Sequence, residues 1–202
     1  MNALDKKPEI VVFAGPNGSG KSTITELLRP TNIPYVNADE IQRILNCDNL
    51  QAAKIAEQKR EDYLKKHKGF CFETVLSTDR NLNLLKRAKS AGFFIRCYYV
   101  LTADPQINVV RVMSRVSAGG HDVPVDKIIS RYDKALALVQ HLIPICDVCH
   151  IYDNSTDSPY RIFKKRKDKY WYCSEKYLWL KADIVALTGI KNPEKAALNP
   201  SR

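Results

Sequence analysis

The stretch AGPNGSGKST, residues 14–23, has the residue types and the spacing that bind the phosphates of ATP. It follows an apolar run at 9–14. A glycine-rich loop lets backbone N–H groups approach phosphate oxygens, and the N-terminus of the next helix favours negative charge. We expect Lys21 to bridge the β- and γ-phosphates and Ser22 to ligate Mg²⁺. The predicted nucleotide-binding residues of this loop are Gly15, Pro16, Asn17, Gly18, Ser19, Gly20, Lys21, Ser22 and Thr23.

The wording of this loop also occurs in transporter-type ATPases, which pass the phosphate to water. Enzymes of that class carry a Ser-Gly-Gly-Gln signature and an apolar strand that ends in Asp-Glu, and neither occurs in this sequence. The double glycine downstream, Gly119-Gly120, is followed by His121 and Asp122 rather than by Gln. The sequence therefore favours a kinase, which passes the phosphate to a substrate.

Two carboxylates end predicted strands that follow the loop in sequence. Asp39 ends the stretch 34–39, and Glu73 lies at the end of 69–74. Ligands of an open parallel sheet bind at the carboxyl ends of its strands, and an attacking hydroxyl needs a carboxylate to accept its proton. We expect Asp39 to be the catalytic base and Glu73 to contact the substrate. The alternative for either is a helix N-cap, which suits Asp39 best.

Several cations surround the double glycine at Gly119-Gly120. Arg111 and Arg115 are four residues apart and share a predicted helical face, and His121 and Arg131 follow the glycines. Positioned arginines stabilise the charge that develops during phosphoryl transfer. The pattern predicts a lid at about 104–143 that carries catalytic arginines; the alternative is a solvated basic helix.

Alternating strand-like and helical patterns must position these groups, and they indicate an α/β fold with a mostly parallel sheet of five or six strands. The chain is expected to form a single domain over 1–202, with a C-terminal extension from about 160. Strands are predicted at 9–14, 34–39, 69–74, 93–101 and 145–154, with a hairpin at 161–173. Helices are predicted at 21–29, in a long stretch from about residue 40 to near Gly69, and at 77–92, 104–120 and 123–143.

The composition indicates an anionic partner and a reducing compartment. A net charge of +10 over 202 residues suits nucleotides, nucleotide-sugars, nucleic acid or an acidic surface, unless the lysines are simply solvated. The six cysteines are scattered, several within apolar runs, and we expect a cytoplasmic protein with free thiols and no membrane segment. The haem-attachment spacing CDVCH at 146–150 lacks the exported context and a second CxxC, so we interpret it as a coincidence within a buried strand.

Beyond the loop, four further segments resemble the zeta toxin family of small P-loop kinases. They are YVNADEI, FETVLST, RVSAGGHDVPVDKIISRY and YDNS, and the resemblance runs over residues 9–155. It implies a P-loop kinase-type three-layer sandwich with a helical, arginine-bearing lid. It also implies Mg²⁺-dependent transfer from ATP to a sugar hydroxyl, as on UDP-N-acetylglucosamine, a toxic product, and an antitoxin that would be a separate chain.

The resemblance also implies roles for individual residues. Asp39 matches the family's base, and Glu73 matches a substrate-site acid. The lid arginines match Arg111 or Arg115 and then His121 or Arg131, which leaves the second cation open. The substrate-site residues beside Glu73 are Thr74, Ser77 and Thr78. Where founding toxins have Glu-Gly-Thr, this chain has ETVLST, so its substrate loop differs.

Two later segments leave alternatives open. Asn154 in YDNS is expected to contact the adenine base, or else to make a turn. The segment KKRKDKYWY at 164–172 interleaves cations with aromatic rings. It could bind nucleic acid, as a polynucleotide or nucleoside kinase would, or it could be an aromatic strand that covers the sheet. A third class, a non-catalytic nucleotide switch, is disfavoured by the acidic and basic site residues.

Overall fold

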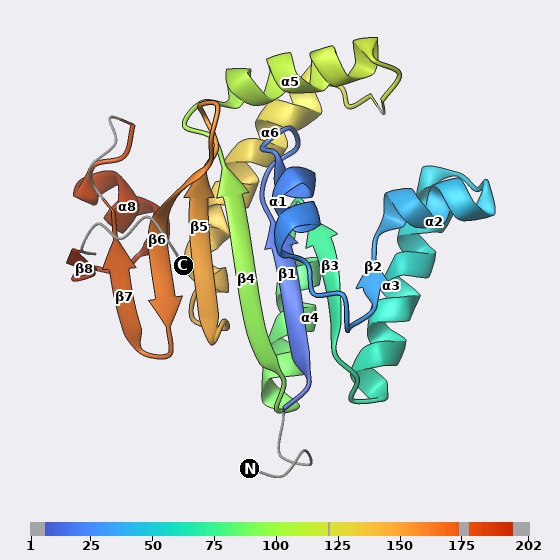
Figure 1. Ribbon diagram of the computed structural model, residues 1–202, viewed down its shortest axis with the longest axis horizontal. Coiled ribbons are helices and arrows are strands. Elements are labelled where there is room, and N and C mark those ends of the chain that lie inside the picture. The colour runs from blue at the N-terminus through green and yellow to red at the C-terminus, as the bar shows by residue number, and fades with distance from the viewer. Residues whose placement is uncertain (1–6, 121, 174–177, 196–202) are drawn as a thin grey trace.

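The computed structural model describes residues 7–120, 122–173 and 178–195, and these form one twisted sheet with helices on its faces (Figure 1). The described part of the chain contributes eight strands in the order β2-β3-β1-β4-β5-β6-β7-β8. The strands are β1 (Glu9–Ala14), β2 (Tyr35–Val36), β3 (Phe70–Thr74), β4 (Phe94–Leu101), β5 (Val148–Asp153), β6 (Tyr160–Arg166), β7 (Lys169–Tyr172) and β8 (Glu194–Lys195). The first five are parallel, as expected, whereas β6 pairs antiparallel with both β5 and β7, and β8 pairs parallel with β7.

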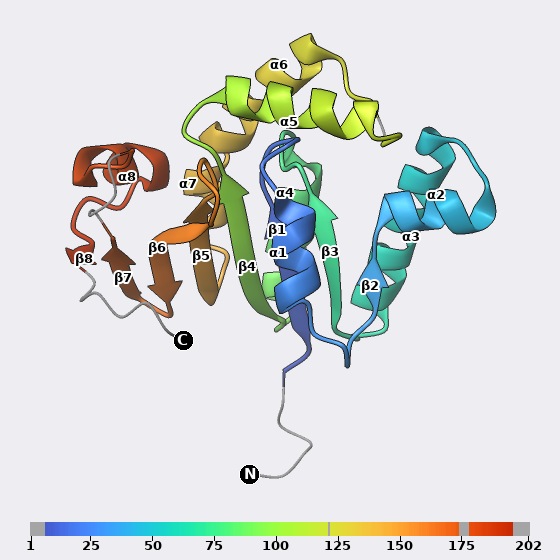
Figure 2. The same ribbon diagram turned by 45° about the horizontal axis from the view of Figure 1, so that its top comes forward.

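The helices surround this sheet. α1 lies in front of β1, α4 and α6 lie behind the sheet, and α5 crosses above the carboxyl ends of β1 and β4 (Figures 1 and 2). The helices are α1 (Lys21–Leu28), α2 (Ala38–Leu45), α3 (Asn49–Lys65), α4 (Asp79–Ser90), α5 (Pro105–Ser117), α6 (Val125–Ala137), α7 (Val139–Leu142) and α8 (Lys181–Thr188). Within the described ranges, none of these is both long and apolar enough to span a bilayer.

The central strands form because their sequence is apolar on the faces that the helices cover. In β1, every residue from Ile10 to Ala14 is fully buried, as expected for a strand that is covered on both faces. In β4 buried residues alternate with half-buried ones, because Ile95, Cys97 and Tyr99 face the helices behind the sheet. No described helix lies over the front of β5 and β6 (Figures 1 and 2).

The C-terminal segment widens the sheet beyond the expected five or six strands. The predicted hairpin is confirmed as β6 and β7, which pair through Lys164↔Trp171 and Lys165↔Tyr170. Because β6 adds to the edge of β5 and β8 adds to β7, three further strands extend the parallel core. This extension was underestimated because a two-residue strand such as β8 leaves no periodic signal.

Two helical predictions are corrected by the structure. The long helix expected after Asp39 is two helices, because Asn46 takes a left-handed conformation (φ 48°) that ends α2. The stretch 123–143 likewise divides into α6 and α7. Helices α5 and α6 pack on each other through a small apolar cluster of their own, which contains Val112 and Ile128.

Candidate active site

The loop between β1 and α1 has a shape that requires glycine at several positions, of which Gly15 and Gly20 show what the loop contacts. A Cβ on Gly15 (φ 141°) would lie 1.9 Å from the carbonyl oxygen of Val100. A Cβ on Gly20 (φ 89°) would lie 2.2 Å from Nδ2 of Asn154. The loop is thus held against β4 and against the segment after β5, with its amides at the N-terminus of α1.

A buried hydroxyl of this loop supports the prediction that it cradles phosphate. Ser19 Oγ has no hydrogen-bond partner among the described residues, and a hydroxyl can donate to a phosphate oxygen. Buried polar atoms are rarely left unpaired in native proteins unless a ligand or water completes them. The loop therefore fits a bound polyphosphate, and Ser22 at the start of α1 has the hydroxyl that could ligate a metal ion beside it.

Lys21 lies at the centre of the charged groups. Its Nζ donates a hydrogen bond of 2.8 Å to the carbonyl oxygen of Pro16, so it folds back over its own loop. Burial lowers the pKa of Lys21 to about 8; the carboxylates of Glu73 and Asp39 oppose this shift, and Arg115 adds to it. The structure therefore brings two predicted acids and one predicted lid arginine into the electrostatic neighbourhood of the loop lysine.

Glu73 is held by hydroxyl groups on both of its oxygens. Ser22 Oγ donates to Oε2 at 3.3 Å, and the Tyr35 hydroxyl donates to Oε1 at 2.9 Å. The Tyr35 hydroxyl in turn accepts a hydrogen bond from Asn37 Nδ2 at 2.6 Å. Burial, together with the Glu73 carboxylate, raises the pKa of Tyr35 far above its ordinary value, so this hydroxyl stays protonated. Glu73 thus lies beside the predicted metal-ligating hydroxyl, closer to the phosphate loop than a purely substrate-binding acid need be.

Asp39 does not cap its helix, contrary to the structural alternative. The N-cap of α2 is Asn37, whose Oδ1 accepts hydrogen bonds from the backbone N–H groups of Asp39 (2.7 Å) and Glu40 (3.2 Å). Asp39 is the second residue of the helix, and its side chain is exposed. Its carboxylate is therefore not consumed by capping and remains available to a substrate hydroxyl.

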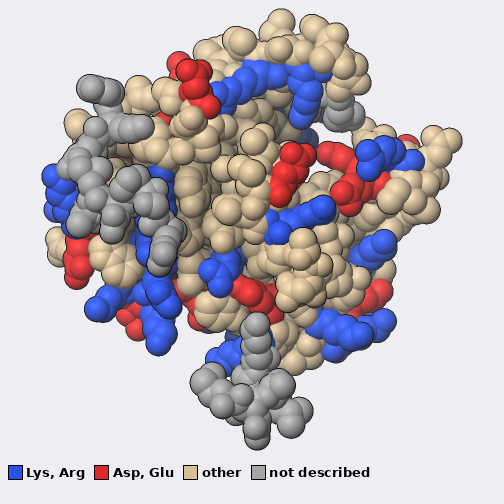
Figure 3. All heavy atoms as spheres, viewed as in Figure 1, with Lys and Arg blue, Asp and Glu red and all other residues tan. Residues whose placement is uncertain are grey.

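The two arginines of α5 lie near different parts of the candidate site. Arg111 Nη1 donates a hydrogen bond of 2.6 Å to the carbonyl oxygen of Asn154, on the segment after β5. Arg115, one turn later, is exposed and acts electrostatically on Lys21. Figure 3 shows basic side chains along α5 facing acidic side chains across a hollow. Both arginines lie on one face of α5, as their spacing predicts. That face runs across the site, so Arg111 lies near Asn154 and Arg115 acts on Lys21.

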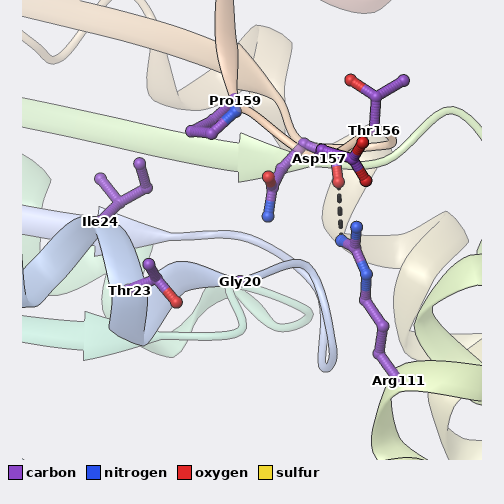
Figure 4. Close-up of a pocket in the computed structure, with 8 residues that line it drawn as sticks. Gly20, Thr23, Ile24, Arg111, Thr156, Asp157 and Pro159 are labelled. Carbon is purple, nitrogen blue, oxygen red and sulfur yellow. Dashed lines mark hydrogen bonds between the residues drawn. The ribbon is translucent and has the colours of Figure 1, made fainter.

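A cavity of about 330 Å³ opens beside the phosphate loop, at the end where Arg111 lies. Its lining residues are Gly20, Thr23, Ile24, Arg111, Asn154, Thr156, Asp157 and Pro159. In Figure 4 Ile24 and Thr23 approach from α1, and Arg111 approaches from α5 on the opposite side. A volume of this size suits a heterocyclic base, and the guanidinium offers a flat cationic surface at its rim.

Asn154 has a more structural position than expected. Its Nδ2 donates a hydrogen bond of 2.9 Å to the carbonyl oxygen of Ser19. The amide therefore ties the segment after β5 to the phosphate loop. Asn154 still lines the base-sized cavity, but its side-chain amide donates to the phosphate loop rather than into the cavity.

The other predicted site residues lie around this centre. Thr74 is buried, and its hydroxyl accepts hydrogen bonds from the N–H of Leu76 (3.0 Å) and from Asn81 Nδ2 (2.9 Å), so it shapes the loop after β3. Ser77 is half-buried and Thr78 is exposed at the N-cap of α4. They lie in the same loop, and their contact with a substrate stays a prediction.

The second lid cation remains a prediction. Arg131 is half-buried on α6, and among the described hydrogen bonds and ion pairs none joins it to the phosphate loop. Its neighbour Tyr132 donates a hydrogen bond to the carbonyl oxygen of Thr102, which ties α6 to the end of β4. His121 lies outside the described residues.

Sequence reasoning missed Tyr35 and Asn37. A signal for Asn37 was present, because Asn followed three residues later by Glu40 resembles a helix-start pattern. Nothing local pointed to Tyr35, since its partner Glu73 is 38 residues away in the chain. The Tyr35 ring also lies under the guanidinium of Arg29, with the carbon 4.6 Å from the ring centroid.

Comparison of the sequence with known proteins finds one similar protein of unassigned function. No family model matches the chain. An uncharacterized protein of Haemophilus influenzae is 31% identical over 127 residues, which span 60% of this chain and 91% of that protein.

Three solved structures have similar folds at low sequence identity. A chain of the PezAT chromosomal toxin–antitoxin system of Streptococcus pneumoniae has a TM-score of 0.58 at 17% identity, over 79% of this chain and 72% of that chain. A chain of the AvrRxo1-ORF1:-ORF2 complex with ATP has a TM-score of 0.63 at 12% identity, over 80% of this chain and 59% of that chain. A chain of the Pnkp1/Rnl/Hen1 RNA repair complex has a TM-score of 0.54 at 19% identity, over 67% of this chain and 46% of that chain. The expected resemblance to zeta-type P-loop kinases is thus confirmed at the level of the fold.

Proposed function

We propose that this chain, which belongs to the same family as the Haemophilus influenzae protein, is an ATP- and Mg²⁺-dependent phosphotransferase with an alcohol group as acceptor. The observation that carries the proposal is the group of charges around Lys21: Glu73 at the end of β3, which accepts from Ser22, together with Asp39 of α2 and Arg115 of α5, which act electrostatically on Lys21. Phosphoryl transfer needs a phosphate cradle, a base and positioned cations, and these residues supply all three. On this proposal the chain acts as one domain, with α5 and α6 as its lid.

Each residue has a distinct task in such a reaction. Asp39 accepts the proton of the acceptor hydroxyl, and the oxygen of that hydroxyl bonds to the γ-phosphorus of ATP. At the same time the bond between the γ-phosphorus and the ADP oxygen breaks, and ADP leaves. Lys21 and Arg115 offset the charge on the transferred group. Glu73 orients the Ser22 hydroxyl, which would hold Mg²⁺; the ion would neutralise charge between the β- and γ-phosphates.

The cavity beside Arg111 is the proposed site for the adenine base. It adjoins Gly20 and Thr23 at the start of α1, so a base there would lead directly to phosphates on the loop. Arg111 is held toward the cavity by its bond to the Asn154 carbonyl. We therefore assign Arg111 to nucleotide binding and Arg115 to the transferred phosphate, with Arg131 as a further candidate.

The acceptor proposed is a sugar or nucleotide-sugar of the UDP-N-acetylglucosamine type. The support is the zeta-type resemblance together with the fold shared with the toxin–antitoxin chain. On the same basis the protein would act in the cytoplasm as a toxin, and a separate antitoxin chain would restrain it. The loop 74–78, which departs from founding toxins, would set the choice of acceptor.

The decisive experiment is transfer from γ-labelled ATP to a panel of UDP-sugars, free sugars, nucleosides and oligonucleotides. The wild-type chain should label one acceptor class. Asp39→Asn should bind ATP with unchanged affinity yet transfer roughly 10²- to 10⁴-fold more slowly. The matched control is Asp126→Asn, which removes an exposed acid from the same second position of α6 and so loses the same helix-dipole interaction. Equal transfer rates for the two variants would refute Asp39 as the base.

A polynucleotide or nucleoside kinase is the second candidate function, and the open face of the sheet favours it. Tyr98, His150 and Tyr152 stack there, with ring centroids 5.5 Å and 6.3 Å apart. Burial and the nearby cations Arg161 and Lys164 lower the pKa of His150 to about 3, so its ring is neutral near pH 7. Neutral rings flanked by cations suit stacked bases.

The hairpin divides its aromatic rings between two faces, as neither sequence alternative foresaw. Tyr170 and Tyr172 pack on the core, whereas Trp171 lies beside Lys164, whose Nζ is 5.5 Å from its ring centroid. Binding of single-stranded oligonucleotide over a salt series tests this candidate. Affinity that falls steeply with salt supports it, and salt-independent or absent binding removes it.

A further inference from the structure

Three of the six cysteines converge in the core, although the sequence scatters them. The sulfur atoms of Cys97, Cys146 and Cys149 all lie within 4.8 Å of one another. Cys97 and Cys149 are direct partners in the pairing of β4 with β5, and Cys146 stands just before β5. The CxxC spacing judged coincidental in the sequence thus acquires a third thiol from a distant strand.

The cluster is sealed from solvent and has a buried cation as its neighbour. Cys97 and Cys149 are 0% exposed and Cys146 is 1% exposed. Lys165, opposite Cys149 in the pairing of β5 with β6, is 5% exposed, and its Nζ donates to the carbonyl oxygens of Ile143 and Pro144. Two carbonyl contacts do not neutralise a buried ammonium, which normally requires an anionic partner.

Asp147, the carboxylate near this cation, is already engaged by the Lys89 ammonium and the Ile95 N–H. Cys149 lies directly opposite Lys165 in the strand pairing, so thiolates held in the cluster by a metal ion would supply the missing anionic charge.

We propose that Cys97, Cys146 and Cys149 bind one thiophilic metal ion through their sulfur atoms. Soft thiolate ligands select Zn²⁺ and Cu⁺ among common cellular metals. Charge favours Zn²⁺, because three thiolates, a divalent ion and the Lys165 ammonium sum to zero. Coordination number favours Cu⁺, because structural zinc almost always takes four protein ligands and the described cluster offers three.

The bound ion has a structural role, separate from phosphoryl transfer. It joins β4 to the turn before β5, and β5 leads at its carboxyl end to Asn154, which holds the phosphate loop. Because the ligands are buried, the ion enters as the chain folds, and its binding energy adds to the folding energy.

Metal analysis of the full-length protein tests the proposal. Wild type, Cys146→Ser and Cys71→Ser are refolded under reducing, anaerobic conditions with Zn²⁺ in one arm and Cu⁺ in the other, then desalted and assayed for metal and free thiols. Cys71 is the matched control, since it is also 0% exposed but lies in a different apolar cluster.

We expect about one ion per chain in wild type and in Cys71→Ser, in at least one arm, and a loss of at least tenfold in Cys146→Ser. Metal-free wild type in both arms, or equal retention by Cys146→Ser, overturns the proposal. Should Cys146→Ser fail to fold, Co²⁺ is added to refolding wild type instead. A sulfur-to-cobalt charge-transfer band, or about one Cu⁺ retained per wild-type chain, supports the site, and the absence of both refutes it.

Discussion

Replacing Tyr35 by Phe tests whether the hydroxyl network around Glu73 positions the site. The substitution removes one oxygen, which donates to Glu73 Oε1 at 2.9 Å and accepts from Asn37 Nδ2 at 2.6 Å. The ring keeps its packing and its contact with the Arg29 guanidinium. Asn37 also keeps its role as N-cap of α2, because that role uses its Oδ1. The change is therefore confined to one hydrogen bond of the Glu73 carboxylate and one of the Asn37 amide.

The size of the effect follows from the charge on the acceptor. A hydrogen bond to a charged group contributes about 1.5–3 kcal/mol, which corresponds to a roughly 10- to 150-fold change in rate if it is lost in the transition state. Because Glu73 accepts from Ser22 with its other oxygen, it stays in place but loses its fixed rotation. We expect kcat to fall by about this factor, while the Kd for ATP changes less than about twofold.

The assay is steady-state transfer of labelled phosphate to the acceptor found in the panel, with ATP affinity and thermal melting measured on the same preparations. Tyr63→Phe is the matched control, since Tyr63 is also half-buried but stacks on Phe70, away from the site. An unchanged kcat for Tyr35→Phe would refute the positioning role. So would an equal fall in Tyr63→Phe, because the loss would then reflect general destabilisation.

Two further predictions concern the charged groups of the site. Arg115→Ala should lower kcat by about 10³-fold or more with little effect on ATP affinity. Arg111→Ala should mainly weaken ATP binding. The reverse pattern would contradict the separate roles proposed for the two arginines from their contacts. Burial lowers the pKa of Lys21 from 10.5 to about 8, so the folded state carries the full cost of this charge below pH 8 and loses that cost as the pH rises toward 10.5. Lys21→Gln should therefore raise the Tm of the nucleotide-free protein near neutral pH and raise it less at alkaline pH, whereas exposed Lys86→Gln should show no such trend; a gain that is independent of pH would be the contrary result.

The phosphate loop and its flanking elements could be predicted because their information is local. About 20 consecutive residues contain the whole signal: an apolar strand, the glycines at 15 and 20, and the helix that follows them. Glu73 could be placed for the same reason, since parallel strands deliver their carboxyl ends to one edge of a sheet. Asp39 was expected at a strand end but lies in the first turn of α2, three residues after β2 ends.

The different surroundings of Arg111 and Arg115 could not be predicted from their spacing. A four-residue interval places both on one helical face. It does not say that this face runs from the Asn154 carbonyl, beside the base-sized cavity, toward Lys21 on the loop. That depends on where α5 crosses the sheet, which the packing of α5 on α6 and the strand order set together.

Contacts between distant strands were equally hidden from the sequence. Tyr35 meets Glu73 because β2 lies next to β3, and Cys97 meets Cys149 because β4 pairs with β5 in that register. Local patterns of apolar residues predict that a strand exists, but neither its neighbour nor its register. The local sequence therefore predicted the phosphate-binding loop, whereas the tertiary structure determined which hydroxyls bond to Glu73, where each arginine of α5 lies, and which thiols meet in the core.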